Sequence, residues 1–219
     1  MPKTPMQKML ESIRLAYQFS FDSSRGHIPP EKILTAMAEV PREEFVPLEM
    51  QSFAYDNNAL PIDHGQTISQ PFIVALMTEL LQPTPKSVIL EVGTGSGYQA
   101  AVLSNLVAKI YSLEIIPEMA QEARDRLARL GYDNVEVLIR DGYHGLPEYG
   151  PYDGIIVTAA SPSVPPRLIG QLKPGANLII PLGEPFHYQE LTMIRKEVNG
   201  EIRWQEILGV AFVPMTRRR

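Results

Sequence analysis

The sequence has 219 residues, of which 44% are hydrophobic, enough to bury a substantial core in one large domain or in one domain with a sizeable extension. Its net charge of −5 and pI of about 5.4 argue against a chain built mainly to bind nucleic acid or an anionic membrane surface, because either partner usually requires a basic face. The sequence contains no cysteine, which excludes disulfides, thiolate catalysis and cysteine metal sites.

The remaining composition also argues against metal binding and export. The histidines, at positions 27, 64, 144 and 187, lack the spacing of metal ligands, so we expect no metal. Glu11 and Arg14 interrupt the apolar N-terminal segment, which favours an amphipathic helix over a signal peptide, and no apolar run approaches the roughly 20 residues that span a bilayer. We expect a cytoplasmic, monomeric protein with no nucleic-acid or membrane partner and with 217–219 as a solvated tail.

The predicted elements of the first third are mainly helical. After the N-terminal helix, Pro29 and Pro30 begin a second helix whose apolar residues recur at helical spacing. Residues 41–63 are rich in proline, asparagine and acids, and we expect irregular chain with one short helix or strand, wrapped around the core rather than part of it. A helix is predicted from Ser69 or Gln70 to residue 81, with proline in its first turn.

From residue 87 the pattern alternates strand with helix, which predicts an α/β fold with a doubly wound, mostly parallel sheet. The chain beyond residue 190 has no long helical pattern between its apolar runs, so we expect an antiparallel edge at 190–195 and 202–213. The five parallel strands are predicted at 87–92, 109–114, 135–139, 154–158 and 176–180, and the helices between them at about 97–106, 117–130 and 164–172.

The most informative stretch is 88–103, in which a buried apolar strand leads through Gly93, Gly95 and Gly97 into a helix-forming run. Glycines at such a turn allow positive φ and a close approach of the backbone to a ligand, and the helix offers unpaired N–H groups. A dinucleotide fingerprint would have glycine or alanine where this chain has Tyr98. The turn therefore favours another nucleotide-like ligand or, taken alone, a tight corner with no ligand.

Three carboxylates end or follow successive predicted strands, at the edge where open α/β sheets bind ligands. Glu91 would repel a pyrophosphate but attract an ammonium or sulfonium group, and S-adenosylmethionine carries both. Glu114 suits either ribose hydroxyls or the positive end of the next helix. Asp141, before Gly142, suits either an adenine amine or a simple Asp-Gly turn. As a set, the acids and the glycine turn predict a site for S-adenosylmethionine.

A second motif, residues 60–72, is a polar turn that ends where a helix begins. Thr67 and Ser69 offer hydroxyls, and the helix offers N–H groups and a positive dipole end, which together suit a carboxylate. The alternative is that one of these hydroxyls only caps the helix. The turn is therefore predicted to be an anion site or a helix cap.

The segments Gly65–Pro71 (GQTISQP) and Glu91–Ala100 (EVGTGSGYQA) resemble those of the protein L-isoaspartate O-methyltransferase family. The resemblance covers most of 40–183 and includes the closing Phe-Val-Pro at 212–214. The Thr-Ile-Ser turn is its specific part, because a glycine loop alone marks only a broad class of methyltransferases. The chain departs from the common family pattern at position 63, an aspartate where glycine is usual, and at position 211, an alanine where arginine is usual.

The resemblance implies an enzyme of the Rossmann-like methyltransferase fold that transfers methyl from S-adenosylmethionine to the free α-carboxylate of L-isoaspartyl residues in damaged proteins and peptides, starting their repair through a succinimide. Activity on D-aspartyl residues stays open. We divide this single domain, 1–219, into a helical cap with the substrate-binding segment (1–82) and a cofactor-binding core with edge strands (83–219). The resemblance assigns Ser69 and Thr67 to catalysis, His64 and Gln70 to the substrate, and Glu91, Gly93, Thr94, Gly95, Gly97, Glu114, Asp141 and Gly142 to the cofactor.

The expected reaction needs no general base to activate its acceptor. A carboxylate with a pKa of about 4 is already ionised at neutral pH, so its attack on a methyl group needs no general base, and the motifs contain no reactive His-Asp pair. We therefore expect positioning to dominate catalysis. Competing interpretations are a methyltransferase of the same fold with another acceptor and a non-catalytic cofactor-binding module.

Overall fold

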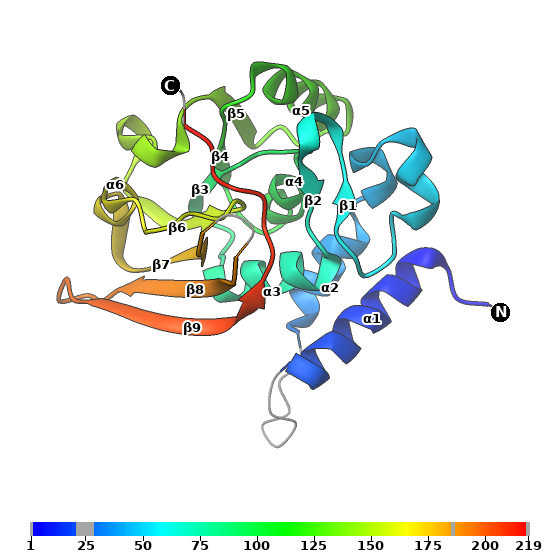
Figure 1. Cartoon of the computed structure of the whole chain (residues 1–219), viewed down its shortest axis with the longest axis horizontal. Coiled ribbons are helices and arrows are strands. Elements are labelled where there is room, and N and C mark those ends of the chain that lie inside the picture. The colour runs from blue at the N-terminus through cyan, green and yellow to red at the C-terminus, as the bar shows by residue number, and fades with distance from the viewer. Residues whose placement is uncertain (1, 21–28, 185–186, 218–219) are drawn as a thin grey trace.

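The computed structural model describes residues 2–20, 29–184 and 187–217, and its centre is a seven-stranded sheet (Figure 1). The strand order is β5-β4-β3-β6-β7-β8-β9, with β3 to β7 parallel and β8 and β9 antiparallel. The predicted parallel strands and antiparallel edge are therefore confirmed. The strands are β3 (Val88–Val92), β4 (Lys109–Glu114), β5 (Val135–Ile139), β6 (Tyr152–Val157), β7 (Leu172–Leu182), β8 (Gln189–Lys196) and β9 (Ile202–Val210).

Six α-helices and five short 3-10 helices are found in the described part of the chain. None of these helices has the length and apolar character that crossing a membrane requires. The α-helices are α1 (Pro5–Ser20), α2 (Glu31–Ala38), α3 (Pro71–Leu81), α4 (Tyr98–Ser104), α5 (Pro117–Arg129) and α6 (Pro166–Gly170). The 3-10 helices are η2 (Arg42–Phe45), η3 (Leu48–Phe53), η4 (Asp63–Gly65), η5 (Gly142–His144) and η6 (Pro147–Tyr149).

Apolar side chains on both faces of the sheet form two buried clusters, as expected for the central strands of a parallel sheet. Ile89 of β3 belongs to the cluster that contains residues of α3, α4 and α5. Its neighbour Leu90 belongs to the other cluster, which includes Leu168 of α6, because successive strand residues point to opposite faces. Helices therefore cover both faces, and the predicted doubly wound α/β fold is confirmed.

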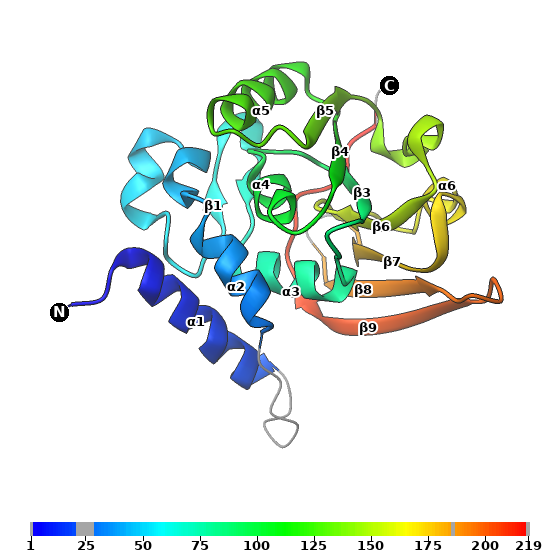
Figure 2. The same ribbon diagram turned by 180° about the vertical axis from the view of Figure 1, so that it is seen from behind.

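The N-terminal helices extend the first of these clusters beyond the sheet. Met9, Ile13 and Tyr17 of α1 recur at helical spacing and are fully buried, as expected of an amphipathic helix. Both α1 and α2 contact α3, and Figure 2 shows them beside α3 at one end of the molecule. The Tyr17 ring meets the Phe72 ring edge-on, with centroids 5.3 Å apart. This cap and the sheet therefore share one continuous core.

Residues 41–63 are more ordered than their composition predicts. Prolines precede both η2 and η3, and Leu60–Pro61 forms β1, which pairs with β2 (Thr67–Ile68). Phe45 and Ala54 are buried in the main core. The expectation that this segment only wraps the core was therefore wrong, because the contacts that order it come from residues distant in the sequence.

The strand order reverses at β3, since β4 and β5 extend the sheet on one side and β6 and β7 on the other. Open α/β sheets bind ligands at such a reversal, beyond the carboxyl ends of the strands. The C-terminal segment after β9 returns past the end of β6, where Ala160 pairs with Pro214 (Figure 1). The topology thus brings the glycine turn, the ends of three strands and the C-terminal segment to one edge of the sheet.

Candidate active site

A cavity lies at this edge of the sheet. Its empty volume is about 830 Å³, which includes open solvent at its mouth. Small-molecule sites are typically clefts lined by apolar side chains and a few polar groups, and this cavity has that composition. The cavity is lined by the turn before α3, the glycine loop, the ends of β3, β4 and β6, and the C-terminal segment. The predicted site residues among its lining are Thr67, Ser69, Gly93, Thr94, Gly95, Glu114 and Gly142.

The glycine loop has the backbone conformation that the sequence predicts. Gly93, Gly95 and Gly97 have φ values of +99°, +54° and +89°, in the region that only glycine adopts readily. A β-carbon on Gly93 would lie 2.5 Å from the Thr158 hydroxyl oxygen, so even alanine is excluded there. Gly97 directly precedes α4, and the loop therefore presents bare backbone to the cavity.

Glu114 at the end of β4 holds the glycine loop and also faces the cavity. One carboxylate oxygen accepts a hydrogen bond from the Gly95 N–H at 2.9 Å, and the other accepts from the Ile115 and Ile116 N–H groups at 2.8 and 3.0 Å. These three donors fix the carboxylate before any ligand arrives, and its free lone pairs can still accept from hydroxyl groups. The two interpretations of Glu114 are thus compatible, because the same carboxylate organises the start of α5 and lines the cavity.

Glu91 lies beneath the glycine loop and is not among the residues that line the cavity. Strand alternation directs its side chain to the same face as Ile89, where it accepts a short hydrogen bond from the Ser112 hydroxyl. Ser112 in turn bonds the Thr94 hydroxyl at 2.6 Å. Direct contact of Glu91 with a cofactor stays a prediction, and the route that the structure offers to the cavity runs through Ser112 and Thr94.

Burial gives Glu91 an unusual protonation behaviour. Its side chain is fully buried, and its second carboxyl oxygen has no hydrogen-bond partner in the described part of the chain. Loss of solvation raises the pKa of Glu91 from 4.5 to about 8, and the nearby Glu114 raises it further, whereas the Ser112 hydrogen bond opposes the shift. Glu91 is therefore mostly neutral at pH 7 in the ligand-free protein.

This shift predicts a falling stability with rising pH. Between pH 4.5 and about 8 the folded protein keeps a proton on Glu91 that the unfolded chain releases, so each pH unit lowers the free energy of unfolding by up to about 1.4 kcal/mol. Glu91→Gln mimics the protonated group and should flatten this slope in denaturant titrations at pH 5, 6, 7 and 8. The exposed Glu118→Gln is the control, and an unchanged slope in Glu91→Gln would contradict the assignment.

The turn before α3 leaves both predicted hydroxyls available. Helix α3 begins after Gln70, which makes no side-chain cap. The cap comes instead from Asn57, whose side-chain oxygen accepts a hydrogen bond from the Phe72 N–H at 2.9 Å. Within the described residues, the Thr67 and Ser69 hydroxyls make no hydrogen bond, so the alternative that they only cap the helix was wrong. No local sequence signal identifies Asn57, because it lies 15 residues before the N–H that it binds.

Removal of this cap should destabilise the protein modestly. We expect Asn57→Ala to lower the free energy of unfolding by about 1 kcal/mol, since the Phe72 N–H would lose its half-buried acceptor. Chemical denaturation against the exposed neighbour variant Asn58→Ala measures the difference. Equal stability of the two variants would show that water replaces Asn57 without cost.

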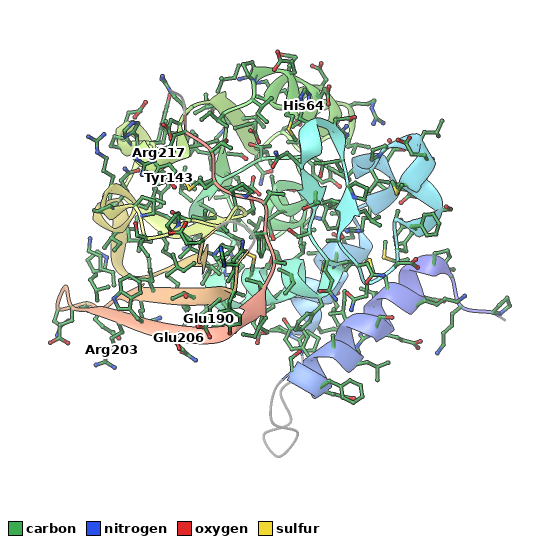
Figure 3. The ribbon with its side chains drawn as sticks, in the orientation of Figure 1. His64, Tyr143, Glu190, Arg203, Glu206 and Arg217 are labelled. Carbon is green, nitrogen blue, oxygen red and sulfur yellow. The ribbon has the colours of Figure 1, made fainter. Side chains whose placement is uncertain are left out.

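The two predicted substrate residues lie outside the cavity lining. His64 is exposed in η4, in the left-handed conformation with φ 57°, and Figure 3 shows it at the rim of the molecule. The Gln70 amide donates to the main-chain oxygen of Asn57 at 2.8 Å. Gln70 thus helps Asn57 hold the turn, and a direct role for either residue at a substrate stays a prediction.

Asp141 has the contacts of a simple Asp-Gly turn, the second of its two predicted interpretations. Its carboxylate accepts a hydrogen bond from the Tyr143 N–H at 3.0 Å and caps η5, as an Asp-Gly turn requires. Asp141 does not line the cavity, although its neighbours Arg140 and Gly142 do. A β-carbon on Gly142 would lie 2.2 Å from a Val92 methyl, so this wall of the cavity also requires glycine.

The C-terminal segment closes the remaining side of the cavity, which the sequence indicates only through the family resemblance. Residues 213–216 line the cavity, and the Met215 N–H donates to the Ala160 carbonyl at 2.7 Å. Arg217 lies over the Tyr143 ring, 3.7 Å from its centroid (Figure 3). Arg217 is nevertheless exposed, as expected of a solvated tail, and 218–219, like His27, lie outside the described residues.

The groups that line the cavity differ from those of a typical metal site. Among the described residues, no group of three or more histidine, aspartate or glutamate side chains is placed to hold a metal ion. The lining combines a carboxylate, free hydroxyls, bare glycine backbone and apolar side chains such as Val92 and Ile115. Such a lining suits a ligand with hydroxyl groups and an apolar ring better than it suits a bare ion.

The family profile and the curated relatives of this chain point to the same family. The profile of the family described as protein-L-isoaspartate(D-aspartate) O-methyltransferase (PCMT) matches residues 19–219. The protein-L-isoaspartate O-methyltransferase 2 of Nitrosococcus oceani is 60% identical over 185 residues, which are 84% of this chain and 84% of that protein.

Solved structures show the same fold. A protein-L-isoaspartate O-methyltransferase superposes with a TM-score of 0.81 at 28% identity, over 97% of this chain and 66% of that chain. A putative protein-L-isoaspartate O-methyltransferase from Plasmodium falciparum, in complex with S-adenosyl-L-homocysteine, superposes with a TM-score of 0.79 at 24% identity, over 99% of this chain and all of that one. With the profile match over most of its length, the chain belongs to the protein-L-isoaspartate(D-aspartate) O-methyltransferase family.

Proposed function

We propose that this enzyme transfers the methyl group of S-adenosylmethionine to the free α-carboxylate of L-isoaspartyl residues in damaged proteins and peptides. The observation that carries the proposal is that Thr67 and Ser69, whose hydroxyls make no hydrogen bond within the described residues, line the same cavity as the glycine loop and Glu114. An acceptor site and a cofactor site thus share one space. Family membership supports both the reaction and the cofactor.

The lining fits S-adenosylmethionine, which supplies an electrophilic methyl group on a positively charged sulfur. We assign the glycine loop, including Thr94, to its amino-acid part and Glu114 to its ribose hydroxyls. Gly93 and Gly142 have no room for a side chain, which keeps the backbone close to the ligand. Glu91 and Asp141 would support these groups from behind, through Thr94 and through the turn at Gly142.

The acceptor carboxylate needs orientation rather than activation, because it is already ionised at neutral pH. The Ser69 hydroxyl would donate a hydrogen bond to one carboxylate oxygen and leave the other free to attack. Helix α3 begins two residues later, and its positive dipole end favours an anion at this turn. Ligands that displace water from the cavity would favour a reaction that consumes opposite charges.

We propose the same division of labour between the two parts of the chain that the sequence analysis expects. Residues 1–82 supply the hydroxyl-bearing turn, and 83–219 supply the cofactor loop and Glu114. The buried core runs from α1 to β7 without a break between these parts. A single domain with a shared cavity is the arrangement that this continuity supports.

The function is tested by methyl transfer from labelled S-adenosylmethionine to paired peptides that differ only in an L-isoaspartyl or L-aspartyl linkage. We expect base-labile label on the isoaspartyl peptide alone, because a methyl ester hydrolyses in base. Cofactor binding without label on either peptide would instead indicate another acceptor or a non-catalytic role.

A further inference from the structure

Arg42 is a fully buried cation that the proposed chemistry does not use. It lies in η2, and none of its surface is exposed to solvent. No carboxylate lies within ion-pair distance of it among the described residues. Burial of a guanidinium is costly unless other groups compensate for the lost water, so the contacts of this side chain require an explanation.

These contacts join three separate parts of the protein. The Arg42 Nε donates to the Ala54 carbonyl at 2.7 Å, and Nη2 donates to the Ser69 carbonyl at 2.8 Å. The guanidinium carbon lies 4.6 Å from the centroid of the Tyr98 ring, within the range of a cation–π contact. Ala54 belongs to the cap, Ser69 to the acceptor turn, and Tyr98 to the first turn of α4 after the glycine loop.

Two of these three partners line the cavity from different sides. Ser69 lies on the wall formed by the acceptor turn, and Tyr98 lies on the wall formed by the cofactor loop. We propose that Arg42 is a positioning residue for methyl transfer, which holds the Ser69 peptide group at a set distance and angle from the cofactor loop. This inference rests on the proposed function and adds to it the group that aligns the two halves of the site.

A purely structural role explains the geometry less well. The buried guanidinium is compensated by two carbonyls and the Tyr98 side chain rather than by a carboxylate, so burial of its charge carries a desolvation cost. An apolar side chain would fill this core position without that cost, as replacements of buried ionic groups have shown. What only a planar guanidinium supplies is a rigid fork that binds two carbonyls at once and stacks on a ring.

The consequence for catalysis follows from the Ser69 peptide group. The hydrogen bond to the Ser69 carbonyl holds the backbone from which the Ser69 side chain projects, and so sets the position of its Cβ relative to the cofactor loop. Within the described residues, no hydrogen bond holds the hydroxyl itself, so its placement depends on that backbone. A displacement of about 1 Å at a reacting group can cost about 100-fold in rate.

The test is Arg42→Lys, because a lysine keeps the charge but reaches only one carbonyl and cannot stack as a plane. The matched control is Arg124→Lys, since Arg124 also donates through Nε to a backbone carbonyl, that of Val137 at 2.9 Å, and neither residue lines the cavity. For each purified, folded variant, kcat and KM for the isoaspartyl peptide and the Kd of S-adenosyl-L-homocysteine are measured. We expect Arg42→Lys to lower kcat/KM about 10 to 100 fold with a Kd within about threefold of the unsubstituted value, and Arg124→Lys to change neither.

A double-mutant cycle with Ser69→Ala separates positioning from general destabilisation. If Arg42 acts through Ser69, Ser69→Ala should cost less than about threefold in the Arg42→Lys background, although it costs roughly 10 to 1000 fold alone. Independent, multiplying losses would overturn the proposal. Full activity of Arg42→Lys, or a loss explained entirely by weaker cofactor binding, would also overturn it.

A second variant covers a failure of Arg42→Lys to fold. Arg42→Gln is neutral, is less costly to bury and can still donate to one carbonyl, and the same cycle applies to it. Turnover of the unsubstituted enzyme distinguishes a failure of the proposed function from a failure of the proposed role of Arg42. Absence of its turnover with the isoaspartyl peptide would refute the proposed function, and the role of Arg42 with it, whereas normal turnover with uncoupled Arg42 variants would overturn the role of Arg42 alone.

Discussion

Ser69→Ala is expected to lower kcat/KM for an isoaspartyl peptide by roughly 10 to 1000 fold, or about 1.4 to 4 kcal/mol of transition-state stabilisation. Ser69 lines the cavity and its hydroxyl makes no hydrogen bond within the described residues, so the substitution takes away a group that is free to orient the acceptor. Its loss should leave the helix cap intact, because Asn57 caps α3. Stability should therefore change little while turnover falls.

Steady-state kinetics at saturating cofactor separate the two parts of this effect. A fall in kcat would show that the hydroxyl acts in the transition state, and a rise in KM alone would show that it only helps to bind the peptide. Ser52→Ala, at an exposed position in the cap, is the control for the loss of a serine hydroxyl. If the unsubstituted enzyme turns over normally and Ser69→Ala has the same kcat and KM, Ser69 has no role in the mechanism.

Glu114→Gln is expected to weaken cofactor binding about 10 to 150 fold, since a hydrogen bond to a charged group contributes about 1.5 to 3 kcal/mol. The glutamine side chain keeps the shape of Glu114 but replaces one acceptor oxygen with an NH₂ donor. Both carboxylate oxygens already accept from backbone N–H groups, so this donor would face another donor whichever way the amide turns. The weakened hydrogen bond to the Gly95 N–H and the lost acceptor for the ribose hydroxyls should therefore both lower the affinity for the cofactor.

Calorimetric titration with S-adenosyl-L-homocysteine measures this change directly. Glu118→Gln, four residues later in an exposed position of α5, controls for the lost negative charge near the same helix N-terminus. If both variants lose affinity equally, the effect is long-range electrostatics rather than contact. If neither does, the ribose assignment of Glu114 is wrong.

Local patterns account for the parts of this protein that the sequence predicts well. The alternation of apolar strands with amphipathic helices, punctuated by glycine and proline, predicts five parallel strands and their antiparallel edge, all of which are confirmed. The positive φ values of the glycine loop also follow from local chemistry, because no other residue adopts them readily. Glu114 is found in the same way, since it ends a strand next to that loop.

Residues whose role depends on distant partners were not predictable in this way. Glu91 has the sequence position of a cofactor ligand, yet strand alternation turns it beneath the loop toward Ser112. Asn57 and Arg42 lie in a segment that the sequence predicts as irregular chain, and the hydrogen-bond partners cited for them are 12 to 27 residues away. No periodicity or spacing rule connects such positions, because the contacts exist only after the cap has packed on α3.

The sequence by itself thus determined the sheet, the cofactor loop and the family, because each rests on the conformational preferences of neighbouring residues or on a contiguous motif. Only the tertiary structure decided which side chains face the cavity. Glu114 lines the cavity whereas Glu91 does not, although both are buried, and a cap supplied by Asn57 leaves the Ser69 hydroxyl free. Those outcomes depend on long-range packing and desolvation, which act between segments that the chain brings together only when it folds.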